Sequence, residues 1–171
     1  MSEVESILLR LPRFEDGMNV FRLIEGCPPL DVNSSYCNLL QCSHFANTSV
    51  TAEQDGDIVG FISGYAIPER ANTLFVWQVA VSEQARGIGL ASRMLAHILA
   101  RPQCNGFRYL ETTITEENQA SWALFRSFAK KQEADFQSSV WMDKEAHFAG
   151  QHDSETLVRI GPFNLKKSVG S

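Results

Sequence analysis

The sequence contains no long apolar run, no cluster of basic residues and no leader-like start, and each absence excludes a class of protein. No stretch approaches the roughly 20 consecutive apolar residues of a membrane-spanning helix. The first residues, Met-Ser-Glu-Val-Glu-Ser, are acidic, whereas a secretion signal needs a basic start and an apolar run. The formal net charge is -5 and no basic run exceeds two residues, so a nucleic-acid partner has no electrostatic support. We expect a cytoplasmic protein with neither a membrane nor a nucleic-acid partner.

Cysteine and histidine are also scarce, with four residues of each type. The cysteines include no Cys-x-x-Cys pair, and no histidine combines with a cysteine at the spacing of a zinc site. In a cytoplasmic chain, cysteines of this kind are expected to be reduced and partly buried. We therefore expect no metal cofactor.

Length and composition instead indicate one globular domain. At 171 residues, with 44% hydrophobic and 20% charged residues, the chain is long enough to bury a single core. No internal repeat or linker divides it. We expect one domain over residues 1–171, with a disordered tail over residues 166–171.

Apolar periodicity predicts alternating strands and helices, and therefore an α/β (α+β) protein. The expected strands cover residues 7–11, 49–54, 58–67, 73–81, 109–114, 136–142 and 157–160. The expected helices cover residues 15–24, 90–99 and 117–130. A further helix is expected after Asn33 or Ser34, either of which can cap it, with Leu39, Leu40 and Phe45 on its apolar side. Asp55-Gly56 predicts a hairpin turn. Gly60 and Gly64 indicate a bulge or close packing.

One stretch combines a buried strand, a glycine turn and an amphipathic helix. The apolar residues 74–81 are followed by Gln84-x-x-Gly87-x-Gly89 and then by apolar residues at helical spacing. Glycines permit a sharp turn, and the first amides of a helix have no intrahelical partner, so the arrangement can bind phosphate. An ordinary strand-to-helix turn is the alternative. The spacing matches neither the dinucleotide motif G-x-G-x-x-G nor a P-loop.

This motif resembles that of the GCN5-related N-acetyltransferase superfamily, and the order of elements is similar over nearly the whole chain. The resemblance implies a mixed central sheet of about seven strands flanked by about four helices, with acetyl-CoA as the co-substrate. It implies pantetheine contacts along the strand and pyrophosphate contacts at the turn. The residues concerned are Val79, Ala80 and Val81 on the strand, and Arg86, Gly87, Ile88, Gly89 and Leu90 at the turn. On physical grounds, the charge of Arg86 can balance phosphate.

A second segment, Glu117-Asn118-x-x-Ser121-x-x-Leu124-Phe125, resembles the fourth helix of that superfamily. The resemblance implies that Asn118 and Ser121 contact the pantetheine or the phosphates; a helix cap and a solvent-exposed serine are the alternative. Phe125 departs from the family, because many members have a tyrosine there that protonates the leaving thiolate. Another group or a water then supplies the proton, or coenzyme A leaves as a thiolate, which the acidity of thiols permits.

Three longer segments resemble the diaminobutyrate acetyltransferases of ectoine biosynthesis. They are Pro-Pro-Leu-Asp-Val-Asn-Ser-Ser-Tyr, Phe-Val-Trp-Gln-Val-Ala-Val and Gly-Gln-His-Asp-Ser-Glu-Thr-Leu, spread over residues 28–157. The resemblance implies acetyl transfer to the side-chain (N4) amine of L-2,4-diaminobutyrate, a small-molecule substrate. It also implies a homodimer, for which the late strands are plausible contact elements.

Five residues suit that substrate, which carries two ammonium groups and one carboxylate. The expected catalytic pair is Glu155, which draws the proton from the γ-amine directly or through water, and Asp31, which holds the α-ammonium. The ring of Trp77 can face a cation. His152 is expected to orient Glu155 or the substrate carboxylate, and backbone amides or Tyr36 are candidates to bind that carboxylate. The neutral amine then attacks the thioester directly, while strand N–H groups stabilise the oxyanion.

Plainer roles remain open for these residues. Trp77 can serve in core packing, Asp31 as a capping or turn carboxylate, and His152 and Glu155 in a solvated polar loop over residues 144–155. Two other functions also remain open. One is acetyl transfer to protein amines or another small amine, and the other is an acetyl-CoA sensor without catalysis, which Phe125 permits.

Overall fold

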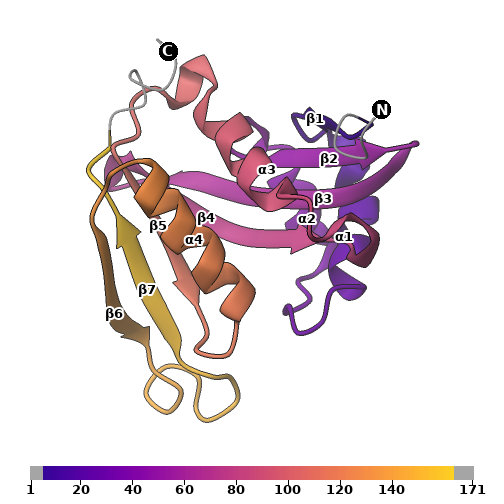
Figure 1. Ribbon diagram of the computed structural model, residues 1–171. Coiled ribbons are helices and arrows are strands. Elements are labelled where there is room, and N and C mark those ends of the chain that lie inside the picture. The colour runs from indigo at the N-terminus through magenta and orange to yellow at the C-terminus, as the bar shows by residue number, and fades with distance from the viewer. Residues whose placement is uncertain (1–5, 164–171) are drawn as a thin grey trace. The chain divides into compact units, whose positions relative to one another are not determined.

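The computed structural model describes residues 6–163, whose strands form a seven-stranded mixed sheet in the order β1-β2-β3-β4-β5-β7-β6 (Figure 1). The strands are β1 (Leu8–Arg10), β2 (Val50–Gln54), β3 (Asp57–Ile67), β4 (Arg70–Val81), β5 (Tyr109–Ile114), β6 (Phe136–Met142) and β7 (Glu155–Ile160). The α-helices are α1 (Gly17–Glu25), α2 (Ser35–Gln41), α3 (Leu90–Leu99) and α4 (Gln119–Lys131). The expected fold class is confirmed. The tail expected over residues 166–171 lies outside the described residues.

The described chain divides into two compact units, so the expectation of one domain over residues 1–171 stays a prediction. The first unit comprises residues 6–65 and 77–105, and the second comprises residues 66–76 and 106–163. Strand β4 contributes to both, because its residues up to Val76 belong to the second unit and those from Trp77 onward to the first. None of the described helices is long and apolar enough to cross a membrane.

The first unit is built on the antiparallel strands β1, β2 and β3. The turn between β2 and β3 is Asp55-Gly56, with φ of 52° and 85°, which confirms the predicted hairpin because its favoured turn has positive φ at both positions. Gly60 pairs with Ala52 beside a bulge, and a Cβ on Gly60 would lie 3.0 Å from Met94 on α3. Both interpretations of Gly60, bulge and close packing, are therefore confirmed.

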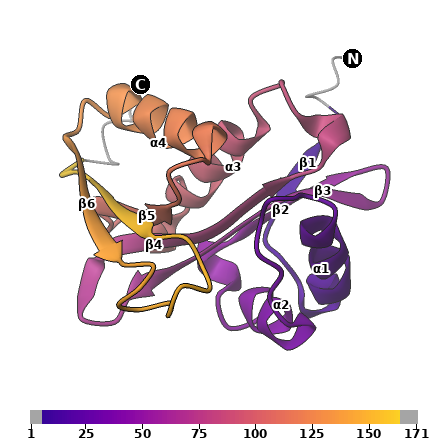
Figure 2. The ribbon, with the colours of Figure 1, turned by 90° about the horizontal axis from the view of Figure 1, so that it is seen from below.

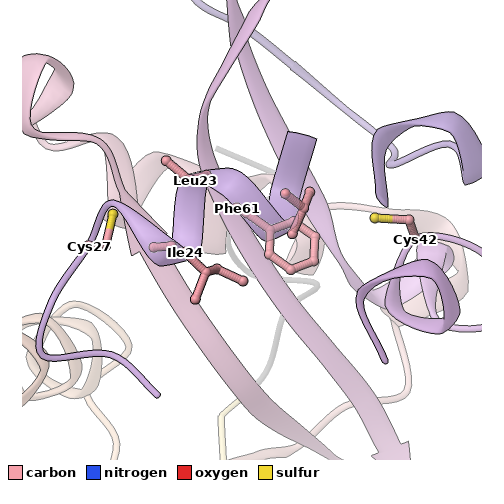
Figure 3. Packing of buried hydrophobic residues seen from close by; sticks show 7 residues of the cluster. Leu23, Ile24, Cys27, Cys42 and Phe61 are labelled. Carbon is pink, nitrogen blue, oxygen red and sulfur yellow. The ribbon is translucent and has the colours of Figure 1, made fainter. Parts of the chain in front are cut away.

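Helices cover both faces of this part of the sheet. Within the first unit, α1 and α2 lie on one face of β1–β3 and α3 lies on the other (Figure 2). The core on the α1 side is one cluster of buried side chains in which Ile24 and Phe61 lie close together (Figure 3). Its members are Val20, Leu23, Ile24, Cys27, Cys42, Phe61 and Ala80. Because Ala80 belongs to β4, this cluster anchors α1 to the C-terminal half of that strand.

Helix α2 begins where the sequence predicts and buries two amide side chains in addition to the predicted leucines. The Ser34 Oγ accepts a hydrogen bond of 3.1 Å from the Cys37 N–H, so Ser34 is the N-cap. Leu39 and Leu40 are half-buried, and Leu39 lies close to Gly17 of α1, whereas Asn38 and Gln41 are fully buried, which the sequence does not predict. The Asn38 Nδ2 donates to the Gln41 Oε1 over 2.9 Å, which satisfies one polar atom of each amide. The Asn38 Oδ1 and the Gln41 Nε2 are buried without a hydrogen-bond partner among the described residues.

The second unit is built on the first half of β4, with β5, β7 and β6. Strands β4 and β5 pair in parallel from Thr73–Tyr109 to Val76–Thr112, while β7 is antiparallel to both β5 and β6. Helix α4 lies over β5 and β7 (Figure 1) and buries Phe125 and Phe128. The Glu111 carboxylate is buried on β5 and pairs with Arg70 and Arg159 on the neighbouring strands.

Several boundaries differ from the prediction. Strand β7 begins at Glu155 and not at residue 157, so Glu155 is a strand residue opposite Met142 and does not belong to the polar loop. Helix α4 begins two residues later than predicted because Asn118 caps it. Helix α1 is preceded by a short 3-10 turn over Phe14–Asp16.

The four cysteines are free thiols, as expected. Cys27, Cys42 and Cys104 are buried and Cys37 is partly exposed. Burial, with the nearby Asp16 carboxylate, raises the pKa of the Cys42 thiol to about 12. Such a thiol is protonated and poorly reactive at neutral pH.

Candidate active site

The turn between β4 and α3 has the backbone conformation that its glycines predict. Gly87 and Gly89 have φ of 81° and 74°, in the left-handed region that favours glycine. A Cβ at either position would meet nothing within 4 Å. The requirement for glycine is therefore conformational, and the turn keeps open space above its backbone.

Helix α3 begins directly after this turn with free amide groups. Gly89 is its N-cap and offers no side-chain acceptor, and the Arg93 N–H makes an intrahelical bond to the Gly89 carbonyl. The N–H groups of residues 90–92 thus precede the first such bond, as at any helix start. Together with the helix dipole they form a site suited to an anion such as a pyrophosphate.

Arg86 is exposed at the start of the turn, and its side chain also folds back onto β4. Its Nε donates to the Val81 carbonyl over 3.2 Å, and the Cys27 Sγ donates to the same carbonyl over 3.4 Å. The Ser82 N–H donates to the Val59 carbonyl over 2.8 Å, which holds the start of the turn against β3. The end of β4 is therefore fixed to α1, to β3 and to the turn.

At the start of α4, the capping interpretation of Asn118 is confirmed. The Asn118 Oδ1 accepts a hydrogen bond of 3.2 Å from the Ser121 N–H, and both residues are partly exposed. Contacts of Asn118 and Ser121 with a cofactor stay a prediction. Phe125 is 1% exposed, one turn further along α4 and within the core.

Asp31 and Trp77 both belong to the first unit, where β4 connects them. Asp31 is exposed, but its backbone carbonyl accepts a hydrogen bond of 3.2 Å from the Nε2 of Gln78. The Gln78 Oε1 accepts a second bond, of 3.3 Å, from the Nδ2 of Asn33. Trp77, the residue before Gln78, is 39% exposed, so its indole is accessible from solvent.

The indole of Trp77 is packed against two further rings. Its centroid lies 6.1 Å from that of Phe45 and 5.8 Å from that of Tyr65, at steep interplanar angles of 76° and 89°. Phe45 and Tyr65 are themselves 5.7 Å apart. Burial raises the pKa of the Tyr65 hydroxyl above its ordinary value. The rings of Phe45 and Tyr65 thus fix the orientation of the indole through edge-to-face contacts.

His152 and Glu155 lie close in sequence in the second unit. The His152 Nδ1 is 2.6 Å from the Asp153 carbonyl, and its ring lies 4.6 Å from that of Phe148. Both contacts are made within its own loop. Glu155 is half-buried at the first position of β7. Tyr36, on α2 of the first unit, is 69% exposed. The assigned roles of all three residues stay predictions.

Comparison with known proteins decides the family. The model of the acetyltransferase (GNAT) family matches residues 18–129, more than half of the chain. The chain belongs to the GNAT family. This confirms the resemblance inferred from the glycine turn, and the match includes that turn and most of α4.

Two relatives and one solved structure are all named as diaminobutyrate acetyltransferases. The L-2,4-diaminobutyric acid acetyltransferase of Methylotuvimicrobium alcaliphilum is 58% identical over 157 residues, which is 92% of this chain and 91% of the relative. That of Vibrio parahaemolyticus is 52% identical over 153 residues, 90% of this chain and 84% of the relative. The solved diaminobutyrate acetyltransferase EctA from Paenibacillus lautus, in complex with its substrate L-2,4-diaminobutyric acid and coenzyme A, is 40% identical. The structural match between the two chains has a TM-score of 0.88 and covers 92% of this chain and 95% of the EctA chain.

Two features of the candidate site in this GNAT chain are not predicted by any sequence motif. The rings of Phe45 and Tyr65 come from separate elements, and only the fold brings them to Trp77. Gln78 stands within a motif-bearing segment, but its two bonds reach a loop more than 40 residues earlier in the chain. Gln78 occupies an inward position in the alternation of β4. An amide at a strand position where alternation predicts burial needs hydrogen-bond partners, and this is the signal that could have identified Gln78.

Proposed function

We propose that this GNAT enzyme transfers the acetyl group of acetyl-CoA to N4 of L-2,4-diaminobutyrate, giving N4-acetyl-L-2,4-diaminobutyrate and coenzyme A. The observation that carries the proposal is the 58% identity with a named diaminobutyric acid acetyltransferase over 92% of the chain. The solved EctA relative, which holds both diaminobutyric acid and coenzyme A, supports the same substrate pair. The reaction belongs to ectoine biosynthesis.

Acetyl-CoA supplies the thioester, and the chain supplies groups of suitable chemistry to bind it. The amides at the left-handed turn of Gly87 and Gly89 and at the start of α3 suit the pyrophosphate, with Arg86 adding positive charge. We assign the remaining turn contacts to Ile88 and Leu90. Backbone groups of residues 79–81 are proposed to bind the pantetheine, and Asn118 and Ser121 are proposed to assist from α4.

Starting from the neutral amine, the reaction forms a bond between N4 and the acetyl carbon, breaks the carbon–sulfur bond and releases one proton from N4. We assign proton removal to Glu155 and retention of the α-ammonium to Asp31. The two roles fall to different carboxylates, because a carboxylate that held the γ-amine as an ammonium group would oppose its attack on the thioester. The Trp77 ring faces a cationic part of the substrate. Phe125 cannot donate a proton, so the thiolate leaves unprotonated or accepts a proton from another group or from water.

The test is an assay of free thiol released from acetyl-CoA in the presence of L-2,4-diaminobutyrate, with the acetylated nitrogen identified by NMR. We expect release that depends on diaminobutyrate and a product acetylated at N4. Release with peptide amines but not with diaminobutyrate would overturn the assignment in favour of a protein acetyltransferase. Thermal stabilisation by acetyl-CoA without any thiol release would indicate a sensor.

We further infer a cytoplasmic homodimer. The four free thiols suit a reducing compartment. Strand β6 is the last strand of the sheet, and its Val140 and Trp141 are 75% and 46% exposed. An exposed apolar edge strand readily pairs with another chain. Light scattering should give a dimer mass for the wild type and a lower mass for Val140→Lys; a monomeric wild type would refute the dimer.

A further inference from the structure

We propose that Gln78 is a positioning residue for substrate recognition, because it holds the loop that carries Asp31 against β4 next to Trp77. The inference rests on the proposed function, in which Asp31 binds the α-ammonium of diaminobutyrate. Gln78 itself does not touch the substrate in this proposal. It acts through the loop between α1 and α2.

The side-chain amide of Gln78 is buried, with 9% of the residue exposed, and both of its ends are used. The Nε2 donates to the Asp31 carbonyl over 3.2 Å, and the Oε1 accepts from the Asn33 Nδ2 over 3.3 Å. One amide therefore fixes two loop residues that are two positions apart. A buried amide with satisfied hydrogen bonds at both ends strongly specifies the geometry around it.

The two ends of the loop are anchored by other contacts. Cys27, at the end of α1, is buried in the core cluster and bonds the Val81 carbonyl, and Ser34 caps α2. The segment between them, with Asp31 at its centre, has no regular secondary structure. Leu30, directly before Asp31, packs against the core cluster, and Gln78 supplies the hydrogen bonds from residues 31 and 33 to a strand. Loss of Gln78 should therefore loosen the loop from Asp31 onward while leaving Leu30 and both ends in place.

Strand β4 also positions the second recognition group. Trp77 directly precedes Gln78, and its indole is held by the rings of Phe45 and Tyr65. The Gln78 bond holds the backbone of Asp31 and not its exposed carboxylate, so it fixes the point from which that carboxylate extends, beside the residue that follows Trp77 on the strand. A carboxylate and a π-face suit the recognition of a cation, so we expect Gln78 to support discrimination between substrates that have an α-ammonium and those that lack it.

The test compares diaminobutyrate with 4-aminobutyrate, which has the reacting amine and the carboxylate but no α-amino group. In Gln78→Met, a side chain of similar length without polar atoms, we expect KM for diaminobutyrate to rise about tenfold, as two lost hydrogen bonds imply. The preference for diaminobutyrate over 4-aminobutyrate should fall by a similar factor. The values of kcat and of KM for acetyl-CoA should stay within about twofold.

The matched control is Gln41→Met, which removes another buried amide bond of the first unit, that between Asn38 and Gln41. It should lower the melting temperature as Gln78→Met does but leave both KM values and the substrate preference unchanged. If both variants are destabilised and neither changes KM for diaminobutyrate, Gln78 is merely structural and the inference is overturned. Asn33→Ala, at a partly exposed position, removes one bond only and should raise that KM about threefold even if Gln78→Met does not fold. No change in Asn33→Ala would likewise overturn the inference.

Failure of the proposed function is recognised before any variant is measured. A wild-type enzyme that does not acetylate diaminobutyrate overturns the function and this inference with it. An active wild type with an unchanged preference in Gln78→Met overturns the inference alone.

Discussion

The proton that leaves the amine needs an acceptor, reached directly or through water, and Glu155 is our candidate. In Glu155→Gln we expect kcat to fall by about 10²–10⁴-fold, the usual contribution of a general base, while KM for acetyl-CoA changes little. The pH–rate profile should lose the limb that reports ionisation of the carboxylate. Steady-state kinetics over a pH series measure both.

Glu155→Asp is the control for this substitution, because it keeps the carboxylate and shortens its reach. We expect partial activity with the wild-type shape of the pH profile. If Glu155→Gln retains both the wild-type turnover and the wild-type profile, the base must be sought elsewhere. The position of Glu155 on β7, opposite Met142, supports a fixed carboxylate more than the polar loop expected from the sequence would.

Among the elements, the turn from β4 to α3 makes the sharpest prediction for cofactor binding. Gly89 has φ of 74°, so Gly89→Ala places a side chain in the left-handed region at a cost of about 1–2 kcal/mol. We expect KM for acetyl-CoA to rise about 5–30-fold, with little change in KM for diaminobutyrate. Initial-rate kinetics with each substrate varied in turn test this.

Two companion substitutions separate conformation from space. A Cβ on Gly106 would also meet nothing within 4 Å, but Gly106 does not have a positive φ, so Gly106→Ala should have almost no effect. Gly89→Asn should recover part of the affinity, because asparagine tolerates the left-handed conformation better than alanine does. Equal effects of Gly89→Ala and Gly106→Ala on KM would show that the conformation of the turn is not what binds acetyl-CoA.

Elements with a strong local pattern could be predicted from the sequence, and those determined by tertiary contacts could not. Strands β5 and β6 have the predicted boundaries, and the hairpin at Asp55-Gly56 follows from its two residues. The burial of Asn38 and Gln41 on α2 was missed, because amide side chains are usually exposed and no pattern in the sequence marks these two as exceptions. The same limit applies to the ring contacts of Trp77 and to the bonds of Gln78, whose partners lie far away in the sequence.

At the scale of the whole molecule, the response to acid should depend in part on an ion cluster in the first unit. The Arg10 guanidinium binds both oxygens of Asp16, over 2.7 and 2.9 Å, and also reaches Glu53 over 3.2 Å. Burial alone would raise the pKa of Asp16, but hydrogen bonds from Arg10 and from the Arg13 N–H hold it below its ordinary value of 3.8. These bonds connect β1, β2 and the turn before α1.

Because the pKa of Asp16 is lower in the folded than in the unfolded state, its contribution is complete above the ordinary value of 3.8 and is lost as the pH falls through the folded value. We expect Asp16→Asn to lower the free energy of unfolding at neutral pH by about 1–3 kcal/mol. The variant should also lose less stability than the wild type between neutral pH and the acid range. Denaturant unfolding at several pH values measures both quantities, and parallel curves for the two proteins would contradict the prediction.

The continuity of strand β4 limits where the chain can accept an insertion or be opened for circular permutation. The residues of β4 from Thr73 to Val76 pair with β5 in one unit, whereas Trp77 and Gln78 belong to the other, so a single strand contributes to both units. A one-residue insertion between Val76 and Trp77 would invert the side-chain alternation of everything that follows in the strand. Circular permutants opened at the tip of the Asp55-Gly56 hairpin leave this continuity intact, whereas those opened inside β4 abolish it.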